Sequence, residues 1–276
     1  MGDIQFGLLG EKLGHSLSPQ IHDFLLEKQG LIGNYKLYEL EKEALHEVFQ
    51  MMEKKGILGL NVTIPYKETL FNMVDQVDEH AQNIAAINTI KLENGITYGY
   101  NTDYLGAFSM LKKAQVDLKE KDVLLIGSGG AAKALIYALH LAKARNITVG
   151  GIDLSALQNL KKQFPYIETV TMAELKDSSK QGDIIINTSP VGMYPKIEDS
   201  PVDERVLKNY KTAVDIVYNP LYTRFLTMAK DCGLKTVTGL MMLVDQAVAA
   251  QEIWLNKPLD YAWGSQIHEN LKERFL

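Results

Sequence analysis

The sequence predicts an α/β fold with two units, in which strands and helices alternate along the chain. Short apolar segments of strand length recur between longer segments whose apolar residues follow the helical period. A glycine-rich turn, GSGGAAKA, separates one of these strands from a helix in the middle of the chain. With 276 residues, of which 46% are hydrophobic and 23% charged, the chain is long enough for two domains of moderate size.

The first third of the chain predicts three strands, two helices and a hairpin. Ser18 and Pro19 are expected to be the N-cap and the first residue of a helix that runs to about Lys28. Asn94 and Gly95 form a two-residue turn signal between two strand-like segments, which predicts the tip of a β-hairpin. The remaining elements are the strands IQFGLLG, NYKLYEL and GILGLNVTI and the amphipathic helix KEALHEVFQMMEKK.

The rest of the chain predicts further strand–helix alternation and then helices alone. A helix from about Tyr104 to Lys113 precedes a strand, the glycine-rich turn, a helix and a second strand. More strands are expected within DIIINTSP, TAVDIVYNP and KTVTG, and from Gly239 the pattern is helical. These last helices are too few to form a core of their own, so they are expected to pack on another unit. The predicted domains are residues 1–102, 103–238 and 239–276.

Composition and charge disfavour several classes of protein. The net charge is −5 and there is no basic run, which argues against nucleic acid or a membrane surface as the main partner. Cys232 is the single cysteine, so no intrachain disulfide can form, as is usual in a reducing compartment. No signal-peptide pattern and no membrane-spanning apolar run are present, and the histidines lack metal-ligand spacing. We therefore expect a cytoplasmic protein without a bound metal.

The glycine-rich turn predicts a nucleotide site. Gly127, Gly129 and Gly130 allow a tight turn and a close backbone approach, and the next helix offers free N–H groups to a pyrophosphate. The spacing departs from the usual G-x-G-x-x-G. A glycine-rich connection without a ligand is the alternative, but the strand before the turn and the helix and strand after it favour the nucleotide site.

Small polar residues gather at predicted strand ends in the first hundred residues. Ligands of open α/β sheets bind at such positions. Each residue also has a local explanation: Ser18 can cap a helix, Asn88 and Asn101 can form turns, and Lys67 can be a solvated surface lysine. Taken together, they offer hydroxyls, an amide, one cation and one anion, which suits a small polyhydroxylated acid. The set is Ser16, Ser18, Thr63, Lys67, Asn88 and Asp103.

These motifs, in this order, resemble the shikimate dehydrogenase family over essentially the whole chain. The resemblance implies an N-terminal substrate domain completed by the C-terminal helices, plus a Rossmann-type dinucleotide-binding domain. It also implies a monomer or homodimer that reduces 3-dehydroshikimate reversibly to shikimate with NAD or NADP, in the biosynthesis of aromatic amino acids. The matching segments are SLSP, NVTIPYK, NT at 88–89, NTD at 101–103, GSGGAAKA, NTSPVGM, VDIVYNPLYT and GLMMLVDQA.

The resemblance also implies roles for individual residues. Lys67 matches the catalytic lysine and Asp103 matches its partner, whereas Ser16 and Ser18 match the groups that hold the substrate carboxylate. Further substrate contacts are implied for Asn61, Thr63, Asn88, Tyr218 and Gln246. Cofactor contacts are implied for Gly127, Ser128, Gly129, Gly130, Ala131, Thr188, Ile216, Gly239 and Met242.

The strand after the glycine-rich turn departs from the family pattern. Many members continue with Asn-Arg-Thr or Asn-Arg-Ser, where the arginine binds the 2′-phosphate of NADP, but this chain has Gly151, Ile152 and Asp153. An acid at this distance is placed to accept hydrogen bonds from the ribose hydroxyls and would repel a 2′-phosphate. Asp153 and the missing arginine therefore favour NAD, although the family default is NADP and Lys161 or Lys162 could reach a phosphate.

Two other functions remain open at this point. One is an NAD-dependent quinate/shikimate dehydrogenase of catabolism. Such relatives often have threonine at the second hydroxyl of the SLSP motif, so Ser18 favours shikimate. The other is a non-catalytic nucleotide-binding regulator, against which the intact Lys67 and Asp103 argue.

Overall fold

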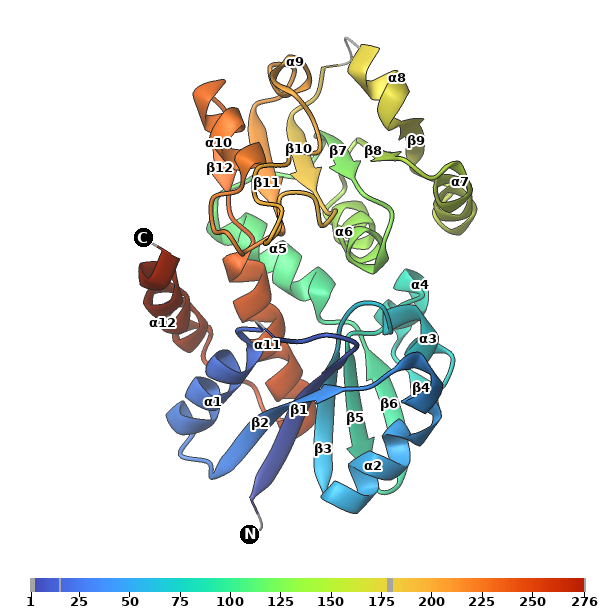
Figure 1. The fold of residues 1–276 in the computed structure, drawn as a ribbon, viewed down its shortest axis with the longest axis vertical. Coiled ribbons are helices and arrows are strands. Elements are labelled where there is room, and N and C mark those ends of the chain that lie inside the picture. The colour runs from blue at the N-terminus through green and yellow to red at the C-terminus, as the bar shows by residue number, and fades with distance from the viewer. Residues whose placement is uncertain (1–2, 15, 178–180, 276) are drawn as a thin grey trace. The chain divides into compact units, whose positions relative to one another are not determined.

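The computed structural model describes residues 3–14, 16–177 and 181–275. They form two compact units, each with its own mixed α/β architecture (Figure 1). The first unit comprises Met1–Gly106 and Leu243–Asn270, and the second comprises Ala107–Met242 and Leu271–Leu276. The chain crosses between the units within three helices, α5 (Asp103–Lys113), α11 (Leu240–Leu255) and α12 (Tyr261–Lys272). The predicted α/β fold class is confirmed.

The first unit is built on a mixed six-stranded sheet with the order β2-β1-β3-β5-β6-β4. Strand β1 is parallel to β2 and β3, whereas β5 is antiparallel to both β3 and β6. Consequently β3 and β6 run in the same direction, and their carboxyl ends lie at the same edge of the sheet. The strands are β1 (Ile4–Gly10), β2 (Gly33–Glu39), β3 (Ile57–Val62), β4 (Gln76–Val77), β5 (Thr89–Glu93) and β6 (Ile96–Tyr100).

Apolar side chains cover both faces of this sheet. Phe6 of β1 packs towards α1 (Ser18–Lys28) and α11, where its ring stacks on Trp254 at 4.4 Å between centroids. Leu9 of the same strand points to the opposite core. The helices at that second core are η1 (Lys42–Glu47), α2 (Val48–Lys55), α3 (Lys67–Phe71) and α4 (Glu79–Ile84), and α12 (Tyr261–Lys272) follows α11.

Two local predictions in this unit have different outcomes. The hairpin turn is confirmed, since Asn94 and Gly95 have φ values of 53° and 77° between β5 and β6. The single amphipathic helix predicted before β3 is wrong in part, because its first six residues form the 3₁₀ helix η1. Leu45 and Val48 are both buried and three residues apart, a spacing that lines up on a 3₁₀ turn.

The second unit has a fully parallel six-stranded sheet with the order β12-β11-β10-β7-β8-β9. This is the Rossmann-type strand order, in which the direction of progression reverses between β7 and β10. Ligands of such sheets bind at the carboxyl ends of the strands beside that reversal. The strands are β7 (Asp122–Ile126), β8 (Asn146–Gly151), β9 (Glu168–Thr171), β10 (Ile184–Asn187), β11 (Thr212–Asp215) and β12 (Lys235–Val237).

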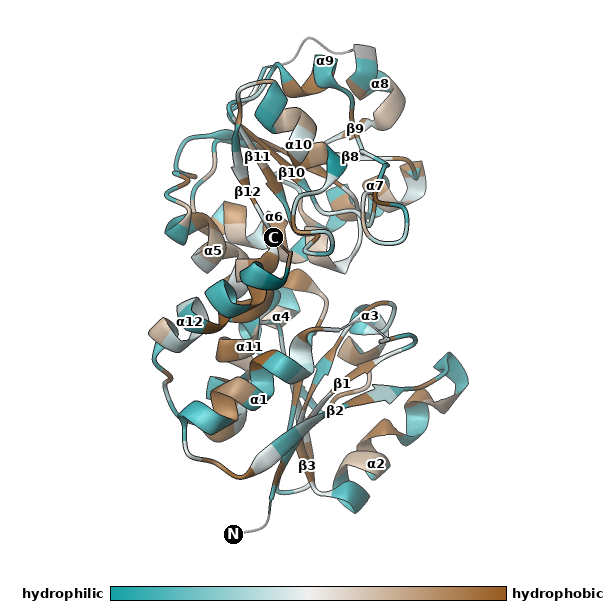
Figure 2. Cartoon of the chain, turned by 60° about the vertical axis from the view of Figure 1, so that its left-hand side comes forward, coloured by the Kyte–Doolittle hydropathy of each residue, from teal (hydrophilic) through white to brown (hydrophobic). Residues whose placement is uncertain are grey.

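Successive residues of the parallel strands enter different cores, so the strands are apolar on both faces. Leu125 belongs to the core beneath α5, α6 and α7, and Leu124 belongs to the core beneath α8, α9 and α10. In the hydropathy view of Figure 2, strands β10 and β11 are brown because both of their faces are buried. Helix α11 is also largely apolar and brown. These helices are α6 (Gly130–Leu141), α7 (Leu154–Gln163), α8 (Met172–Asp177), α9 (Glu204–Leu207) and α10 (Arg224–Asp231), and the short η2 (Glu273–Phe275) ends the described chain.

Candidate functional site

A lysine–aspartate pair stands at the carboxyl edge of the first sheet. Lys67 is the first residue of α3 and follows β3, and Asp103 is the first residue of α5 and follows β6. Because β3 and β6 end at the same edge, the two side chains meet, with Nζ 2.6 Å from Oδ2. Only 16% and 9% of their side-chain surfaces are exposed. Lys67 is therefore not a solvated surface lysine.

Asn88 fixes the second oxygen of the aspartate. Its Nδ2 donates to Oδ1 of Asp103 at 2.9 Å and to Oγ1 of Thr102 at 3.0 Å, while its Oδ1 accepts from the Thr102 N–H at 2.6 Å. Gln246, which α11 contributes, places Oε1 within 3.4 Å of the same Nδ2. Both oxygens of Asp103 are thus engaged, and the carboxylate has one defined orientation. This buried network is more than the local turn that Asn88 could have formed.

Ser16 and Ser18 precede and begin α1, but their roles at its terminus are not those predicted. The N-cap is Leu17, and Ser18 is the first helical residue, so the prediction that Ser18 caps the helix is wrong. Ser16 Oγ instead accepts from the Ser18 N–H at 3.2 Å. The Ser18 side chain is buried and hydrogen-bonds with the Tyr35 hydroxyl, a long-range contact that no local pattern encodes.

Two further predicted residues lie on or just after β3. Thr63 is half-buried and its N–H donates to the carbonyl of Leu9 at 3.0 Å. Asn61 is buried: its Nδ2 donates to the Asn88 carbonyl and to Thr89 Oγ1, and its Oδ1 accepts from the Tyr35 hydroxyl at 2.9 Å. Both polar atoms of the Asn61 side chain are therefore hydrogen-bonded, and they link β3 to Tyr35, Asn88 and Thr89.

The glycine-rich turn connects β7 to α6 in the second unit. Gly127 has φ of 118°, and an added Cβ would lie 2.8 Å from Oγ1 of Thr188, so this position requires glycine. Gly129 is the N-cap of α6, and the first turn of that helix carries no acidic side chain. Thr188 follows β10, the strand beside β7 at the reversal, and donates to the Ile126 carbonyl at 2.9 Å. Backbone N–H groups of the first turn of α6 thus lie at the carboxyl edge of the sheet, and helix N-termini at such edges are places where anions bind.

The remaining predicted residues of this unit lie at the ends of β11 and β12. An added Cβ on Gly239 would approach the carbonyl oxygen of Ile216 to 2.3 Å, so glycine lets the two backbones touch. Ile216 and Tyr218 are half-buried, and burial raises the pKa of the Tyr218 hydroxyl. Met242 belongs to the apolar core of this unit. The two half-buried side chains extend the carboxyl edge on the far side of β10.

Asp153 is the N-cap of α7, directly after β8. Its Oδ1 accepts from the hydroxyl and the N–H of Ser155 and from the N–H of Ala156, and these hydrogen bonds lower the pKa of the carboxyl. Among the described residues, nothing donates to Oδ2. Ile152, which stands where the family pattern has arginine, is 92% exposed. Lys161 Nζ donates to the carbonyls of the loop after α7, namely those of Pro165 and Ile167.

The predicted site residues do not include a buried acid at the carboxyl edge of the second sheet. Asp215 ends β11 and accepts hydrogen bonds from Thr223 Oγ1 at 2.6 Å, the Val217 N–H at 2.9 Å and Asn187 Nδ2 at 3.1 Å. Burial raises its pKa to about 6. It ties together the ends of β10 and β11, which carry Thr188 and Ile216. The signal in the sequence is an acid at the end of an apolar strand, in VDIVYNP.

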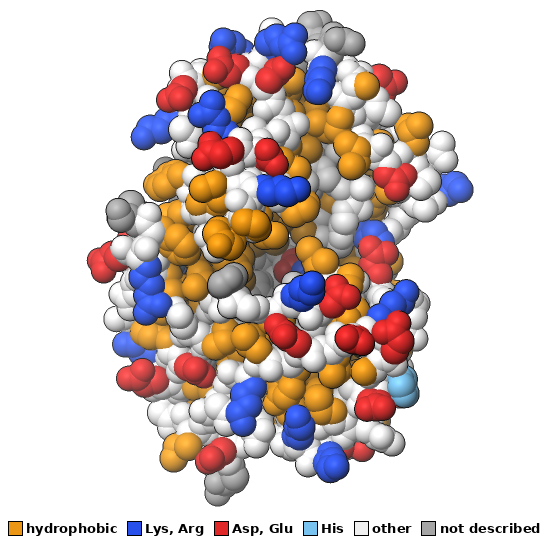
Figure 3. Space-filling model, in the orientation of Figure 1, with side chains coloured by type: hydrophobic (Ala, Val, Ile, Leu, Met, Phe, Trp, Pro, Cys, Tyr) orange, Lys and Arg blue, Asp and Glu red, His pale blue; other side chains and the backbone are white. Residues whose placement is uncertain are grey.

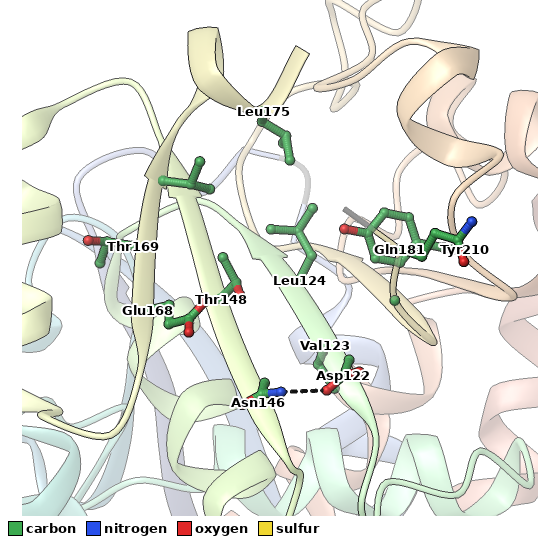
Figure 4. Close-up of a pocket in the computed structure, with 12 residues that line it drawn as sticks. Asp122, Val123, Leu124, Asn146, Thr148, Glu168, Thr169, Leu175, Gln181 and Tyr210 are labelled. Carbon is green, nitrogen blue, oxygen red and sulfur yellow. Dashed lines mark hydrogen bonds between the residues drawn. The ribbon is translucent and has the colours of Figure 1, made fainter. Parts of the chain in front are cut away.

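A separate pocket of about 200 Å³ lies at the opposite, amino end of the second sheet (Figure 4). Asp122, Asn146 and Glu168 begin three neighbouring strands around it, and Asn146 donates to Asp122 at 2.8 Å. None of the predicted site residues lines this pocket. The pocket therefore lies away from the carboxyl edge that carries the predicted residues.

Acidic and basic side chains are interspersed over the face in Figure 3. Within residues 3–14, 16–177 and 181–275, no three His, Cys, Asp or Glu side chains are grouped as metal ligands would be. No helix in the same ranges combines the length and apolar character needed to cross a membrane.

Comparisons with known proteins show the family of the chain. Residues 8–90 match the family model of the shikimate dehydrogenase substrate binding domain, and residues 109–220 match that of shikimate / quinate 5-dehydrogenase. A curated relative from Clostridium perfringens, named shikimate dehydrogenase (NADP(+)), is 43% identical over 98% of this chain and 99% of its own length.

Solved structures are similar over nearly the whole chain. A chorismate mutase/shikimate 5-dehydrogenase fusion protein from Clostridium acetobutylicum has a TM-score of 0.93 and 39% identity, with 100% of this chain and 99% of that chain covered. The shikimate 5-dehydrogenase of Thermus thermophilus in complex with NADP(H) and shikimate has a TM-score of 0.87 and 32% identity over 97% and 99%. The shikimate 5-dehydrogenase of Listeria monocytogenes in complex with shikimate and NAD has a TM-score of 0.84 and 26% identity, with 96% of each chain covered. The chain belongs to the shikimate dehydrogenase family.

Proposed function

We propose that the protein is a shikimate dehydrogenase, an oxidoreductase that interconverts 3-dehydroshikimate and shikimate. The observation that carries this proposal is the Lys67–Asp103 pair, held at 2.6 Å and oriented by Asn88 among hydroxyl groups at one sheet edge. A ketone reduction needs a proton donor beside the carbonyl oxygen, and such a constellation provides one. The relatives named above carry the same activity in their names.

The proposed roles of the residues differ between the two units. In the first unit, Lys67 donates a proton to the oxygen of the reacting ketone, or accepts it from the hydroxyl in the oxidative direction. Asp103 holds the Lys67 amine and accepts a hydrogen bond from a neighbouring substrate hydroxyl. The hydroxyls of Ser16 and Ser18 bind the substrate carboxylate. When bound, the nicotinamide cofactor supplies the hydride.

The other contacts follow the same division. Substrate contacts are proposed for Asn61, Thr63, Asn88, Tyr218 and Gln246. The dinucleotide is proposed to bind the second unit, with its pyrophosphate at the N-terminus of α6. Its contacts are proposed for Gly127, Ser128, Gly129, Gly130, Ala131, Asp153, Thr188, Ile216, Gly239 and Met242.

Steady-state kinetics with shikimate and quinate test this function. We expect kcat/KM for shikimate to exceed that for quinate by about tenfold or more, because quinate carries an additional hydroxyl beside its carboxylate and Ser18 is buried against Tyr35. Equal values for the two substrates would favour the quinate/shikimate alternative. Turnover of neither substrate, despite dinucleotide binding measured by calorimetry, would instead favour the non-catalytic regulator.

We further propose that Asp153 shifts cofactor preference towards NAD. Its Oδ2 accepts no hydrogen bond from the described residues, and position 152 holds isoleucine in place of the arginine of the family pattern. The Lys161 amine donates to loop carbonyls. A ribose 2′-hydroxyl can donate to Asp153 Oδ2, whereas a 2′-phosphate is repelled by it. The proposed preference differs from that of the Clostridium perfringens relative, which is named as an NADP(+) enzyme.

Replacing Asp153 by serine tests the cofactor proposal. Serine retains an N-cap for α7 but removes the charge, so the helix should remain intact. We expect the ratio of kcat/KM for NADP to that for NAD to rise about tenfold or more, since a hydrogen bond to a charged group contributes about 1.5–3 kcal/mol. Calorimetric Kd values for both cofactors provide a second measurement. An unchanged ratio would show that Asp153 serves α7 alone.

A further inference from the structure

We propose that His22 and Tyr35 are positioning residues for the substrate-carboxylate site. The Tyr35 hydroxyl donates to Oδ1 of Asn61, and we infer that the buried Nε2–H of His22 is directed at the same oxygen. With this shared acceptor, the Ser18 hydroxyl is free to donate to the carboxylate. The proposal rests on the proposed function, in which Ser18 binds that carboxylate. All four residues belong to the first unit.

The position of the proton on His22 follows from its hydrogen bonds. Gln251 Nε2 lies 3.1 Å from Nδ1 of His22 and 3.0 Å from the His22 carbonyl oxygen. The orientation of this amide is fixed at its other end, because Gln251 Oε1 accepts from Gln29 Nε2 at 2.7 Å. An amide nitrogen only donates, so Nδ1 is the acceptor and carries no hydrogen. A neutral ring must then be protonated at Nε2.

The ring is neutral because it is enclosed. His22 is fully buried in α1 and stacks on Tyr35 with 4.1 Å between centroids and 5° between planes. Burial lowers its pKa to about 3, although the neighbouring Asn61 side chain acts in the opposite direction. Nε2 makes no hydrogen bond of normal geometry to any described residue. A buried N–H without an acceptor is unfavourable, so a neighbouring oxygen is expected to serve it.

Asn61 presents that oxygen. Its Nδ2 donates to the Asn88 carbonyl at 3.2 Å and to Thr89 Oγ1 at 3.1 Å, which turns Oδ1 towards Tyr35 and His22. The Tyr35 hydroxyl lies 2.9 Å from this Oδ1. A carbonyl oxygen has two lone pairs, so it can accept from both residues.

Counting hydrogens shows what His22 adds. The Tyr35 and Ser18 hydroxyls contact each other and have one hydrogen each. While Tyr35 donates to Asn61, the Ser18 hydrogen is drawn to the Tyr35 oxygen. When Ser18 turns its hydrogen to a carboxylate, Tyr35 can turn its own to Ser18 Oγ, and His22 Nε2–H still supplies Asn61. Every buried acceptor then has a donor before and after substrate binding.

The same hydrogen bonds reach the reacting pair. Thr89 Oγ1, which accepts from Asn61, donates to Asn88 Oδ1 at 3.0 Å, and Asn88 Nδ2 donates to Asp103. The orientation of Asn61 therefore bears on both ends of the proposed substrate. Because His22 and Tyr35 act at the carboxylate end, their loss should weaken substrate binding more than it slows the chemical step.

Kinetics of four variants and one control variant test the proposal. We expect His22→Phe and Tyr35→Phe each to raise KM for shikimate about tenfold, with kcat and KM for the dinucleotide within about twofold of wild type. The double variant should show less than the product of the two effects, since both residues act through one oxygen. His22→Gln, whose amide nitrogen can donate to Asn61, should lie within about threefold of wild type. Tyr38→Phe, on the same strand but in the opposite core, is the control.

The opposite results would overturn the proposal. The first is an unchanged KM for shikimate in Tyr35→Phe. The second is a rise in KM in the double variant that equals the product of the two single rises. The third is a rise in KM for the dinucleotide as large as the rise in KM for shikimate. If His22→Phe does not fold, Tyr35→Phe and His22→Gln still decide.

A spectroscopic measurement is independent of activity. In ¹⁵N-detected NMR of the wild-type protein at pH 5, we expect His22 to be a neutral, Nε2-protonated ring whose N–H signal moves in Tyr35→Phe. An Nδ1-protonated or cationic ring would refute the proposal. Absent turnover of shikimate by the wild type would refute the proposed function instead, and the NMR result would still decide the tautomer.

Discussion

Replacing Lys67 by alanine is expected to lower kcat for shikimate oxidation by about 10²- to 10⁴-fold, the usual contribution of a positioned acid or base. The amine is the single cation within hydrogen-bonding distance of Asp103 among the described residues, and it has no substitute in the Asn88 network. KM for shikimate should change less than kcat, because the proposed carboxylate contacts lie at Ser16 and Ser18. Single-turnover measurements with both cofactors would separate the chemical step from product release.

Lys91→Ala is a matched control for that variant. Lys91 is also a buried, ion-paired lysine of the first sheet, with Nζ 2.8 Å from Glu93 and 2.9 Å from Asn256. Its loss should reduce stability but leave kcat within about twofold. If Lys67→Ala retained wild-type kcat, the assignment of the proton transfer to this lysine would be wrong.

The second large effect is on acid stability and involves His22. Burial lowers the pKa of this ring from 6.5 to about 3. Because the folded-state pKa is below the unfolded value, the stability contribution of the neutral ring is complete above pH 6.5 and is lost as the pH falls towards 3. Relative to neutral pH, the loss is about 2 kcal/mol at pH 5 and about 3 kcal/mol at pH 4. His22→Gln should escape this loss.

Urea unfolding at pH 7, 5 and 4, followed by tryptophan fluorescence, measures the difference. Both tryptophans, Trp254 and Trp263, belong to the first unit, so their emission reports on the unit that contains His22. The control is His46→Gln, which replaces a histidine whose side chain is 72% exposed and therefore removes no buried group. A constant difference between His22→Gln and wild type across these pH values would contradict the assigned burial effect.

The elements that sequence predicts well are those whose information is local. IQFGLLG forms β1 residue for residue, and the Asn94–Gly95 turn lies between the strands expected to flank it. The helix start at Ser18 was predicted with the wrong cap because the local preference competes with a contact to Tyr35, seventeen positions away. Local propensity carries no information about such a partner.

The candidate site shows the same division. Lys67 and Asp103 can be picked out by motif, but their 2.6 Å contact depends on β3 and β6 ending at one edge, which only the sheet order reveals. His22 has no signal at all, because a histidine on the buried face of a helix resembles any other core residue. Its importance arises from Gln251, which is 229 positions away and belongs to another helix.

The order in which the chain is synthesised has consequences for its first unit. Six strands have left the ribosome by residue 106, yet Trp254, which fills the space above Gly59 and donates to the Ile90 carbonyl at 2.9 Å, is made much later. At a synthesis rate of about 5–20 residues per second, α11 is completed on the order of ten seconds after the sheet on which it packs. Residues 107–242, which contain the buried residues of the two cores of the second unit, are complete before Trp254 is made. Until α11 is made, α1 alone covers this face, so a nascent chain exposes part of it during elongation, and chaperone dependence should be concentrated there.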